Sequence, residues 1–301
     1  AGSVFDVGYP TTTGAFDIDF NGNEQVGLTV GTDIGITKFS ADGSTILYSA
    51  YLGGSRNELP HSLIVNQNNE LLVFGTTSSR DFPTSPTAFD PSFNGGPTVE
   101  FRGLNIGYTG ADIIVSKISE TGNNLLASTF VGGSQNDGLN ISGPLTFNYA
   151  DEVRGEIIAD QSGNIYIAAS TLSSDFPITT SAFQTTLNGM QEGVLFKMDG
   201  ELTTMIWSTF LGGSDDDGAY AMALDENGHI VVAGGTRSAD FPTLNAFQPI
   251  YGGGRADGFI TKVHRNGERL LHSTFYGENT YDQIYFTDLG QDDSVHVLGQ
   301  T

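Results

Sequence analysis

The stretch DGFITKVHRNGERLLHSTFYGENTYD (257–282) decides the fold of this chain, because its key residues recur at the same spacing elsewhere. Within it Lys262 is followed by Ser273, then by Gly277 and then by Asp282. Every other lysine of the chain is followed by a serine, a glycine and an acid at the same intervals. The three sets are Lys38, Ser49, Gly53 and Glu58; Lys117, Ser128, Gly132 and Asp137; and Lys197, Ser208, Gly212 and Asp217. Repetition over this length predicts a tandem array of supersecondary units.

One repeat is long enough for four strands joined by hairpin turns. Such a sheet cannot bury both of its faces alone, and stacking several sheets around an axis solves this problem. We therefore predict an all-β fold, a β-propeller of radially arranged four-stranded antiparallel blades with four full repeats and a partial one. In the last full repeat the expected strands are Ala219–Asp225, His229–Gly235, Asp257–Val263 and Arg269–Tyr276.

The repeats predict a single propeller domain over residues 1–301. Its expected units are about 9–60, 61–139, 140–218 and 219–283, with a partial unit at 284–301. Lys197 and Lys262 are closer in sequence than the other neighbouring lysines. The surplus of the longer units lies in two connections, Pro91–Gly110 and Leu139–Val153, which we expect to project from one rim. No signal peptide or initiator Met is visible, so the chain can be part of a larger protein.

Composition argues against several classes of partner. Twelve Lys and Arg stand against 35 Asp and Glu, and the formal net charge is −23. A nucleic-acid surface needs clustered cations to neutralise phosphates, so nucleic acid and anionic lipid are poor partners. No apolar run is long enough to cross a bilayer, and membrane insertion is not expected. Without cysteine the chain has no disulfide, no thiolate nucleophile and no Cys-ligated zinc.

Several motifs of the chain resemble the bacterial SBBP repeat, which is named for a seven-bladed β-propeller. They recur in one order over nearly the whole chain: TFLGGSDDDG (209–218), DENGHIVVAGGTRSADFPT (225–243), DGFITKV (257–263), YLGGS (51–55) and SSRDFPTSPTAFD (78–90). The chain departs from the pattern in its first repeat, where Phe16–Thr32 reads either as two strands or as a loop. It also carries too few repeats for seven blades, so either residues are missing or closure uses fewer.

The resemblance implies a secreted or cell-surface bacterial protein with no agreed enzymatic activity. The expected partners are an extracellular protein or glycan, neighbouring domains of the same large protein, and, as in some relatives, the type IX secretion machinery. We therefore expect a non-catalytic module for interaction, adhesion or display. Two alternatives stay open: a carbohydrate-active enzyme, for which Asp151, Glu152 and Glu100 are the candidate acids, and a purely structural spacer or filament subunit whose unpaired strand edges join chains.

The repeated polar residues are expected to serve the fold. The serines are small for packing, and each lysine needs a nearby acid because an unpaired buried ammonium is costly. We expect that acid to be the aspartate of a DFP segment (Asp81, Asp175, Asp240) or one of the repeat acids, which are Glu58, Asp137, Asp217 and Asp282. The repeat acids are themselves expected to cap a turn. The alternative is that they line a cation-attracting mouth on one rim together with Asn136, Asp215 and Asp216.

Calcium is the one cofactor that the residues suggest. Asp17, Asp19 and Asn21 resemble the start of a calcium loop, although the twelfth position of an EF-hand is here Leu28 rather than Glu. Asp215 and Asp217 form the second candidate, since Ca²⁺ prefers clustered carboxylates. The alternative for both candidate calcium sites is that the residues form ordinary turns, and in that case the protein needs no cofactor.

Aromatic residues of the two long connections are the candidate ligand contacts. Exposed aromatic side chains on loops stack on sugar rings or on protein partners. The candidates are Phe93, Phe101, Tyr108, Phe147 and Tyr149, and the alternative is that they cover the rim of the array. The sequence contains no HExxH, G-x-S-x-G or P-loop motif, so no catalytic residue is expected.

Overall fold

The computed structural model describes residues 1–26, 29–101, 106–148 and 150–301, which form an all-β protein. The only helical element among these residues is the 3-10 helix Asp151–Val153. The chain divides into two compact units. One comprises Ala1–Asp137 with Glu201–Thr203, and the other comprises Gly138–Gly200 with Thr204–Thr301.

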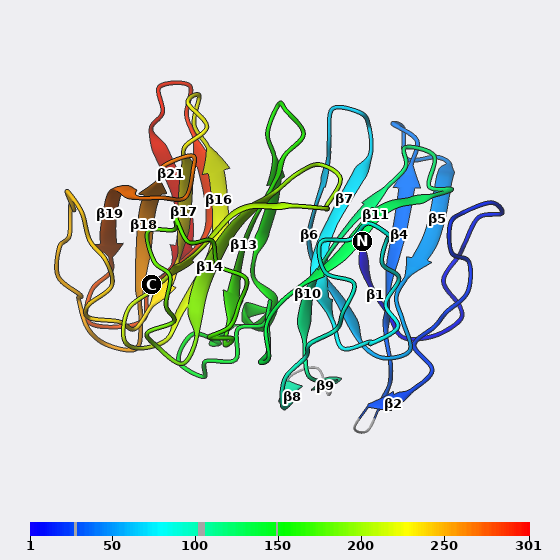
Figure 1. Ribbon diagram of the computed structural model, residues 1–301, viewed down its shortest axis with the longest axis horizontal. Coiled ribbons are helices and arrows are strands. Elements are labelled where there is room, and N and C mark those ends of the chain that lie inside the picture. The colour runs from blue at the N-terminus through cyan, green and yellow to red at the C-terminus, as the bar shows by residue number, and fades with distance from the viewer. Residues whose placement is uncertain (27–28, 102–105, 149) are drawn as a thin grey trace. The chain divides into compact units, whose positions relative to one another are not determined.

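The N-terminal unit contains two main antiparallel sheets (Figure 1). The first has the order β1-β4-β5, with β1 (Gly2–Val4), β4 (Asp33–Phe39) and β5 (Ile46–Leu52). The second has the order β11-β10-β7-β6, with β6 (Glu58–Val65), β7 (Leu71–Thr77), β10 (Asp112–Ile118) and β11 (Leu125–Val131). Two small hairpins extend from the connections, β2 (Gln25–Val26) with β3 (Thr29–Val30), and β8 (Thr98–Phe101) with β9 (Ile106–Thr109).

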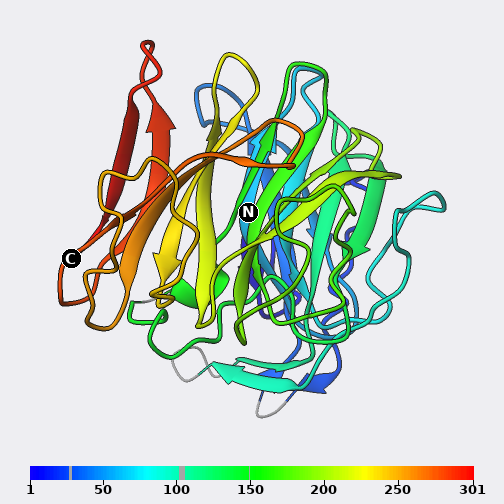
Figure 2. The same ribbon diagram turned by 60° about the vertical axis from the view of Figure 1, so that its left-hand side comes forward.

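The C-terminal unit contains three antiparallel sheets in chain order (Figures 1 and 2). The first consists of β12 (Glu156–Ala159), β13 (Ile165–Thr171), β14 (Glu192–Met198) and β15 (Met205–Leu211). The second consists of β16 (Asp217–Leu224), β17 (Ile230–Thr236), β18 (Asp257–Val263) and β19 (Leu270–Tyr276). The third is the pair β20 (Gln283–Leu289) and β21 (Val295–Gln300), and β20 packs on β16 and β17.

The predicted fold class is confirmed as an all-β protein of antiparallel four-stranded sheets. The four strands expected in the last repeat are β16 to β19, with bounds close to those expected. The ambiguous first repeat differs from the others. Among the described residues of Phe16–Thr32 the only strands are those of the short hairpin β2–β3. The sheet that follows has three strands, with β1 at one edge beside β4.

The repeated serines are buried, and most of them join neighbouring strands through their hydroxyls. All four are buried, with at most 1% of the residue exposed. The Ser49 hydroxyl lies 2.8 Å from that of Thr37, and the Ser273 hydroxyl lies 2.8 Å from that of Thr261. Ser128 bonds Ser116 in the same way at 2.9 Å. Ser208 faces a phenylalanine instead, and its buried hydroxyl has no hydrogen-bond partner among the described residues.

The repeated lysines bind groups of hairpin turns, and the predicted pairing with the DFP aspartates is wrong. Lys262 lies 2.7 Å from Asp225, and Lys197 lies 3.2 Å from Asp160; both acids begin the turn between the first two strands of their own sheet. Lys117 pairs with Glu201 at 2.8 Å, and Lys38 donates to the Glu120 carbonyl at 3.0 Å. The DFP aspartates Asp81 and Asp240 instead accept hydrogen bonds from Ser55 and Ser214 of the GGS turns.

Aromatic side chains of one sheet sit on the turn between the third and fourth strands of the next sheet. Gly122 is in such a turn, its φ is 70°, and a Cβ added there would overlap the ring of Tyr48. Gly267 lies in the same way against Trp207. The amides of Phe16 and Phe183 donate to the carbonyls of these two glycines. Glycine is therefore required for two reasons: the backbone has a positive φ, and the aromatic ring leaves no room for a Cβ.

Replacing Gly122 by alanine tests this contact, and Gly43 is its matched control. Gly43 has a φ of 71° in the equivalent turn but nothing within 4 Å of an added Cβ. Gly43→Ala should cost about 1–2 kcal/mol for the left-handed backbone alone. Gly122→Ala should cost about 1–3 kcal/mol more, because it also overpacks the Tyr48 ring. Urea unfolding measures both, and equal losses would show that the ring contact does not matter.

Candidate functional site

The connection 139–153 replaces regular strand structure in the C-terminal unit and builds the most elaborate polar site there. β12 has four residues where the equivalent β16 has eight. The strand β13 continues beyond β12, and its Ser170 carbonyl accepts a hydrogen bond from the Gly138 amide at 2.8 Å. From this point the chain leaves the sheet and contacts the strand ends of the neighbouring sheets.

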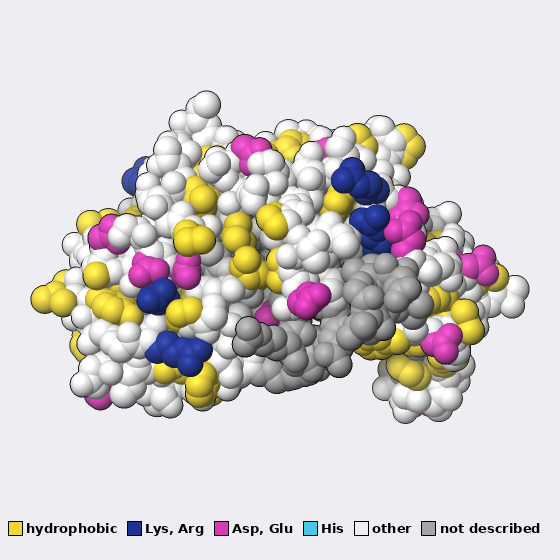
Figure 3. Space-filling view, turned by 90° about the horizontal axis from the view of Figure 1, so that it is seen from below, with side chains coloured by type: hydrophobic (Ala, Val, Ile, Leu, Met, Phe, Trp, Pro, Cys, Tyr) yellow, Lys and Arg dark blue, Asp and Glu magenta, His cyan; other side chains and the backbone are white. Residues whose placement is uncertain are grey.

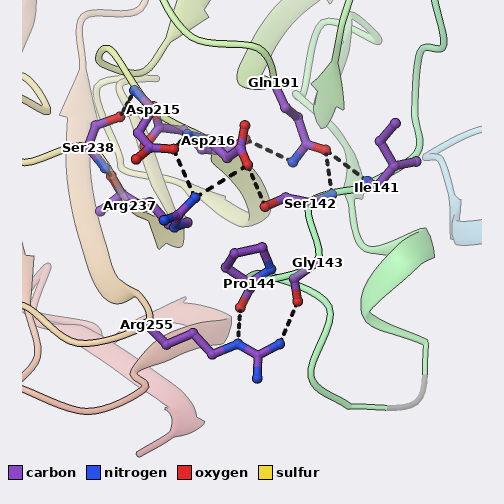
Figure 4. Close-up of polar contacts among 12 residues, drawn as sticks. Ile141, Ser142, Gly143, Pro144, Gln191, Asp215, Asp216, Arg237, Ser238 and Arg255 are labelled. Atoms are coloured by element: carbon purple, nitrogen blue, oxygen red, sulfur yellow. Dashed lines mark hydrogen bonds and ion pairs between the residues drawn. The ribbon is translucent and has the colours of Figure 1, made fainter.

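Asn140 and Gln191 fix the first part of this connection. The Gln191 Oε1 atom accepts hydrogen bonds from the amides of Ile141 (2.8 Å) and Ser142 (3.2 Å), as Figure 4 shows. Its Nε2 atom donates to Asn140 Oδ1 at 2.8 Å. The Asn140 Nδ2 group donates to Tyr220 and to two carbonyls of the connection. Because these polar groups are buried and satisfied, the loop holds a single shape.

Two aspartates and an arginine lie next to this segment. Arg237 Nη1 is 3.0 Å from Asp215 Oδ1 and 3.8 Å from Asp216 Oδ2, and Ser142 Oγ donates to Asp216 Oδ2 at 2.7 Å (Figure 4). The side chains of Arg237 and Asp215 are 34% and 45% exposed, so the ion pair contributes little stability. The cluster therefore acts mainly as a set of positioned polar groups at the surface.

Arg255 anchors the second part of the connection, and two aromatic rings pack beside its guanidinium. Its Nε donates to the Pro144 carbonyl at 3.0 Å and its Nη2 donates to the Gly143 carbonyl (Figure 4). The guanidinium carbon lies 4.9 Å from the Phe147 ring centre, which is itself 5.0 Å from the ring of Tyr281. Phe147 is 56% exposed. A positioned guanidinium thus lies beside two adjacent aromatic rings, one of which is exposed to solvent.

Beneath this surface, the fully buried Asp151 holds the end of the connection. Its Oδ1 pairs with Arg154 Nε at 2.7 Å, and its Oδ2 accepts from the amides of Phe147 (3.0 Å) and Asn148 (2.7 Å). The Tyr281 and Tyr285 hydroxyls lie at 3.4 and 3.5 Å from the same oxygen. This one carboxylate therefore joins the loop to Tyr285 of β20 and to Tyr281, which lies just before that strand.

Both tyrosines of this cluster stay neutral. Burial, the hydrogen bond to Tyr285 and the charge of Asp151 raise the pKa of Tyr281. Burial is also the largest cause of the raised pKa of Tyr285. The guanidinium carbon of Arg154 lies 3.6 Å from the Tyr285 ring centre. The cluster therefore consists of one paired carboxylate and two protonated hydroxyls.

The predicted ligand-contact residues have different environments. Phe147 is exposed as expected, whereas Tyr108 is fully buried, so its prediction as a ligand contact is wrong. Tyr108 lies in the hairpin β8–β9, which folds back so that the Gly107 carbonyl accepts from Asn57. Phe93 is half-buried and packs on Phe130 in the core. Tyr149 and the side chain of Phe101 lie outside the described residues.

The calcium-like loop has the same hydrogen bonds as the matching loop of the next repeat. Asp17 accepts from the Asp19 amide at 3.0 Å and from Asn21 Nδ2 at 2.9 Å. Asp90 accepts in the same way from Ser92 and from Asn94. Among the described residues no group of three or more His, Asp or Glu is arranged to hold a metal ion. Calcium binding at Asp17, Asp19 and Asn21, or at Asp215 and Asp217, stays a prediction.

The repeat acids cap the GGS turns, as predicted. The carboxylates of Glu58, Asp137, Asp217 and Asp282 accept from the amide that directly follows the repeated glycine, at 2.7–3.1 Å. They are at most 7% exposed, so the alternative that they line an open mouth is wrong.

A second carboxylate approaches each of these turns from the first residue of the third strand. At Gly132 an added Cβ would lie 2.7 Å from Asp137 Oδ2 and 2.9 Å from Asp112 Oδ1. The equivalent acids of the other repeats are Asp33, Glu192 and Asp257. Burial raises the pKa of Glu58 and Asp217 to about 8 and that of Asp112 and Glu192 to about 7. Several of these carboxyls therefore hold a proton near neutral pH.

The comparisons with known proteins add no family. No protein-family model matches the chain, and no curated protein matches it. Within the described part of the chain, no helix has the length and apolar character needed to cross a membrane. On the face seen from below in Figure 3, acidic side chains lie next to basic side chains.

The sequence reasoning missed Asn140, Gln191, Arg237, Arg255 and Tyr281. None of them occupies a repeated position, and this is the signal that could have found them. Asp151, Glu152 and Glu100 share this property, and it applies equally to arginines and amides. What the sequence cannot supply is their proximity, since they come from five separate segments of the unit.

The buried carboxyls predict that stability falls as pH rises above about 5. A pKa raised in the folded state means that the folded chain binds protons more tightly than the unfolded chain. This contribution is complete below the unfolded pKa of about 4 and is lost through the folded values, at about 1.4 kcal/mol per pKa unit. Urea unfolding at about pH 5 and about pH 8 measures the loss.

Asp217→Asn should reduce that loss, because burial raises the pKa of Asp217 to about 8 and the amide does not ionise. Asp225→Asn is the control. Although burial raises the pKa of Asp225, the hydrogen bond from Lys262 lowers it below its usual value, so this carboxylate stays ionised throughout the range. Parallel slopes for wild type and Asp217→Asn would contradict the assignment.

Proposed function

We propose that this chain is an SBBP-type β-propeller, a non-catalytic binding module of the bacterial cell surface or secreted fraction. The repeated four-stranded sheets and the packing of β16 on β13 and β14, and of β20 on β16 and β17, support the propeller assignment. The surface or secreted location rests on the resemblance of the repeats. The same holds for export by a type IX route and for neighbouring domains as partners.

The observation that carries the proposal is the surface formed by the exposed side chains of Phe147 and Arg255 and the half-buried ring of Tyr281. Aromatic and arginine side chains are the groups that contribute most to recognition surfaces. Here the guanidinium is already fixed by two carbonyls and the loop by Asn140 and Gln191, so little conformational freedom is lost on binding. Rings of this kind stack on sugar rings, and Asp216, which binds Ser142 of the same connection, and Asp215 beside it offer carboxylates to sugar hydroxyls.

The favoured ligand is a neutral glycan of the cell exterior. The net charge of −23 disfavours anionic polymers, while aromatic rings and carboxylates suit sugar faces and hydroxyls. An extracellular protein is the other outcome of a binding screen.

A carbohydrate-active enzyme is less well supported. Glycoside hydrolysis needs two carboxyl groups that flank the scissile bond. Asp151 is paired with Arg154 and holds the loop, and its other contacts are amides and tyrosine hydroxyls. Glu100 belongs to the N-terminal unit, and Glu152 makes no contact with the aromatic surface that the described residues record. We expect no release of reducing ends from polysaccharides.

Screening glycan and surface-protein arrays, followed by calorimetry, tests the binding surface. Phe147→Ala and Arg255→Ala should each weaken binding of the retained ligand at least about tenfold, or ~1.4 kcal/mol. Phe286→Ala is the matched control, because Phe286 is 58% exposed in the same unit and lies outside the site. Binding that survives both site variants, or that falls equally in the control, would remove the assignment.

A further inference from the structure

A polar pocket of about 740 Å³ lies among the hairpin turns of the two four-stranded sheets of the C-terminal unit. Three turns line it: 160–163 and 225–228, each between the first two strands of a sheet, and 264–267 between β18 and β19. β16 ends at this pocket, whereas Ser142 of connection 139–153 binds Asp216, just before the first residue of β16. The pocket and the connection therefore lie at opposite ends of this strand.

Two acids of the pocket wall are already paired with repeated lysines. Asp160 accepts hydrogen bonds from Lys197 at 3.2 Å and from the Tyr166 hydroxyl at 3.1 Å, and Asp225 lies 2.7 Å from Lys262. Although burial raises the pKa of each acid, hydrogen bonds lower it below its usual value, so both stay ionised. The charges of these two pairs are therefore balanced within the protein.

Two further charged side chains of the wall, Arg265 and Glu226, have no partner of opposite charge. Both occupy exposed turn positions, and within the described part of the chain neither side chain forms an ion pair or a hydrogen bond. Their turns are adjacent, since a Cβ added at Gly228 would lie 4.0 Å from the Arg265 Cβ. The pocket thus presents one cation and one anion that the neighbouring side chains leave unpaired.

The cation is a departure from the repeat. In the N-terminal unit each repeated lysine binds an oxygen of a turn between third and fourth strands: Lys38 the Glu120 carbonyl and Lys117 the Glu201 carboxylate. Arg265 stands at the position of Glu120, three residues after the repeated lysine. Its guanidinium cannot accept a hydrogen bond, and its carbonyl already accepts one from Trp207 at 3.0 Å. The Arg265 side chain therefore takes no part in the contact that this turn makes elsewhere.

Neutral amide side chains line the rest of the pocket. Gln161, Asn227 and Asn266 come one from each turn, and their amide groups have no hydrogen-bond partner among the described residues. A side-chain amide both donates and accepts, so it matches the N–H and C=O groups of a peptide bond. The pocket therefore offers two opposite charges together with groups that suit a peptide backbone.

We propose that this pocket binds a short peptide with free termini, whose α-carboxylate lies on the Arg265 guanidinium and whose α-ammonium group lies on the Glu226 carboxylate. Arginine binds a carboxylate through two parallel hydrogen bonds, which fixes the direction of the ligand. A cube of this volume has an edge of about 9 Å, and an extended chain of two or three residues spans about 7–10 Å. The proposal does not rest on glycan binding, which uses other residues.

NMR titration with trialanine tests the site, with the signals of Asn227 and Asn266 as reporters. Wild type should bind trialanine, and N-acetylation or C-terminal amidation of the peptide should each weaken binding about tenfold, because each removes one charged contact. Alanine should bind more weakly than trialanine, because it has no peptide groups for the amides of the pocket. Glucose, a neutral polyol, should not shift these signals.

Two charge-removing variants identify which end of the peptide each residue binds. Arg265→Gln should weaken trialanine binding about tenfold, and amidating the peptide should then have no further effect. Glu226→Gln should do the same for N-acetylation. Arg269→Gln is the matched control, since Arg269 is 58% exposed in the same hairpin and pairs with Glu268.

The outcomes separate this site from the aromatic surface. Phe147→Ala should leave trialanine binding unchanged, and urea unfolding checks that each variant is folded. The proposal would be overturned by an absence of shifts at about 10 mM trialanine, by equal binding of alanine, glucose or the capped peptides, or by a loss of affinity in the Arg269→Gln control as large as in Arg265→Gln. Variant and ligand effects that simply add would overturn the assignment of the two ends.

Discussion

Two buried carboxyls converge on the glycine that begins each GGS turn and the equivalent GEN turn (277–279), and the rest of the architecture depends on this contact. One carboxyl begins the third strand of a sheet, the other begins the next repeat, and the glycine ends the fourth strand between them. At Gly53 these groups are Asp33 and Glu58. A side chain on the glycine would separate the acids, and loss of an acid would free the turn amide that it binds. Successive sheets within each unit are thereby held at a fixed spacing.

This constraint explains why an acidic protein tolerates charge in its core. Burial above all, and to a smaller extent repulsion from the second acid, favours the protonated form of Glu58 and Asp217, and hydrogen bonds from turn amides lower the cost of the remaining charge. Protons therefore neutralise part of the formal charge in the folded state. The lysines, by contrast, bind acids or a carbonyl of hairpin turns near the surface, so they stabilise the opposite ends of the strands.

Much of the fold could be predicted from spacing alone, because the repeated residues serve repeated contacts. The strands of the last repeat, the packing of the serines and the turn-capping by Asp217 follow from position in the repeat. The partner of Lys262 does not, since Asp225 is brought near it by pairing of β17 with β18 and not by proximity in sequence. The burial of Tyr108 could not be predicted either. Its place in a long connection suggests exposure, but the β8–β9 hairpin buries its ring.

The candidate site could not be predicted because it exists where the repeat is broken. Connection 139–153 removes half of an inner strand, and the main-chain hydrogen bonds lost there are replaced by side chains, chiefly Asn140, Gln191 and Asp151. These side chains stabilise the irregular loop in the way that main-chain hydrogen bonds to a neighbouring strand stabilise a strand. Only after that replacement can Arg255 and Phe147 be presented at fixed positions. The residues outside the repeat thus form two groups. The buried group replaces the hydrogen bonds of the missing strand, and the exposed group is positioned at the surface where a ligand can bind.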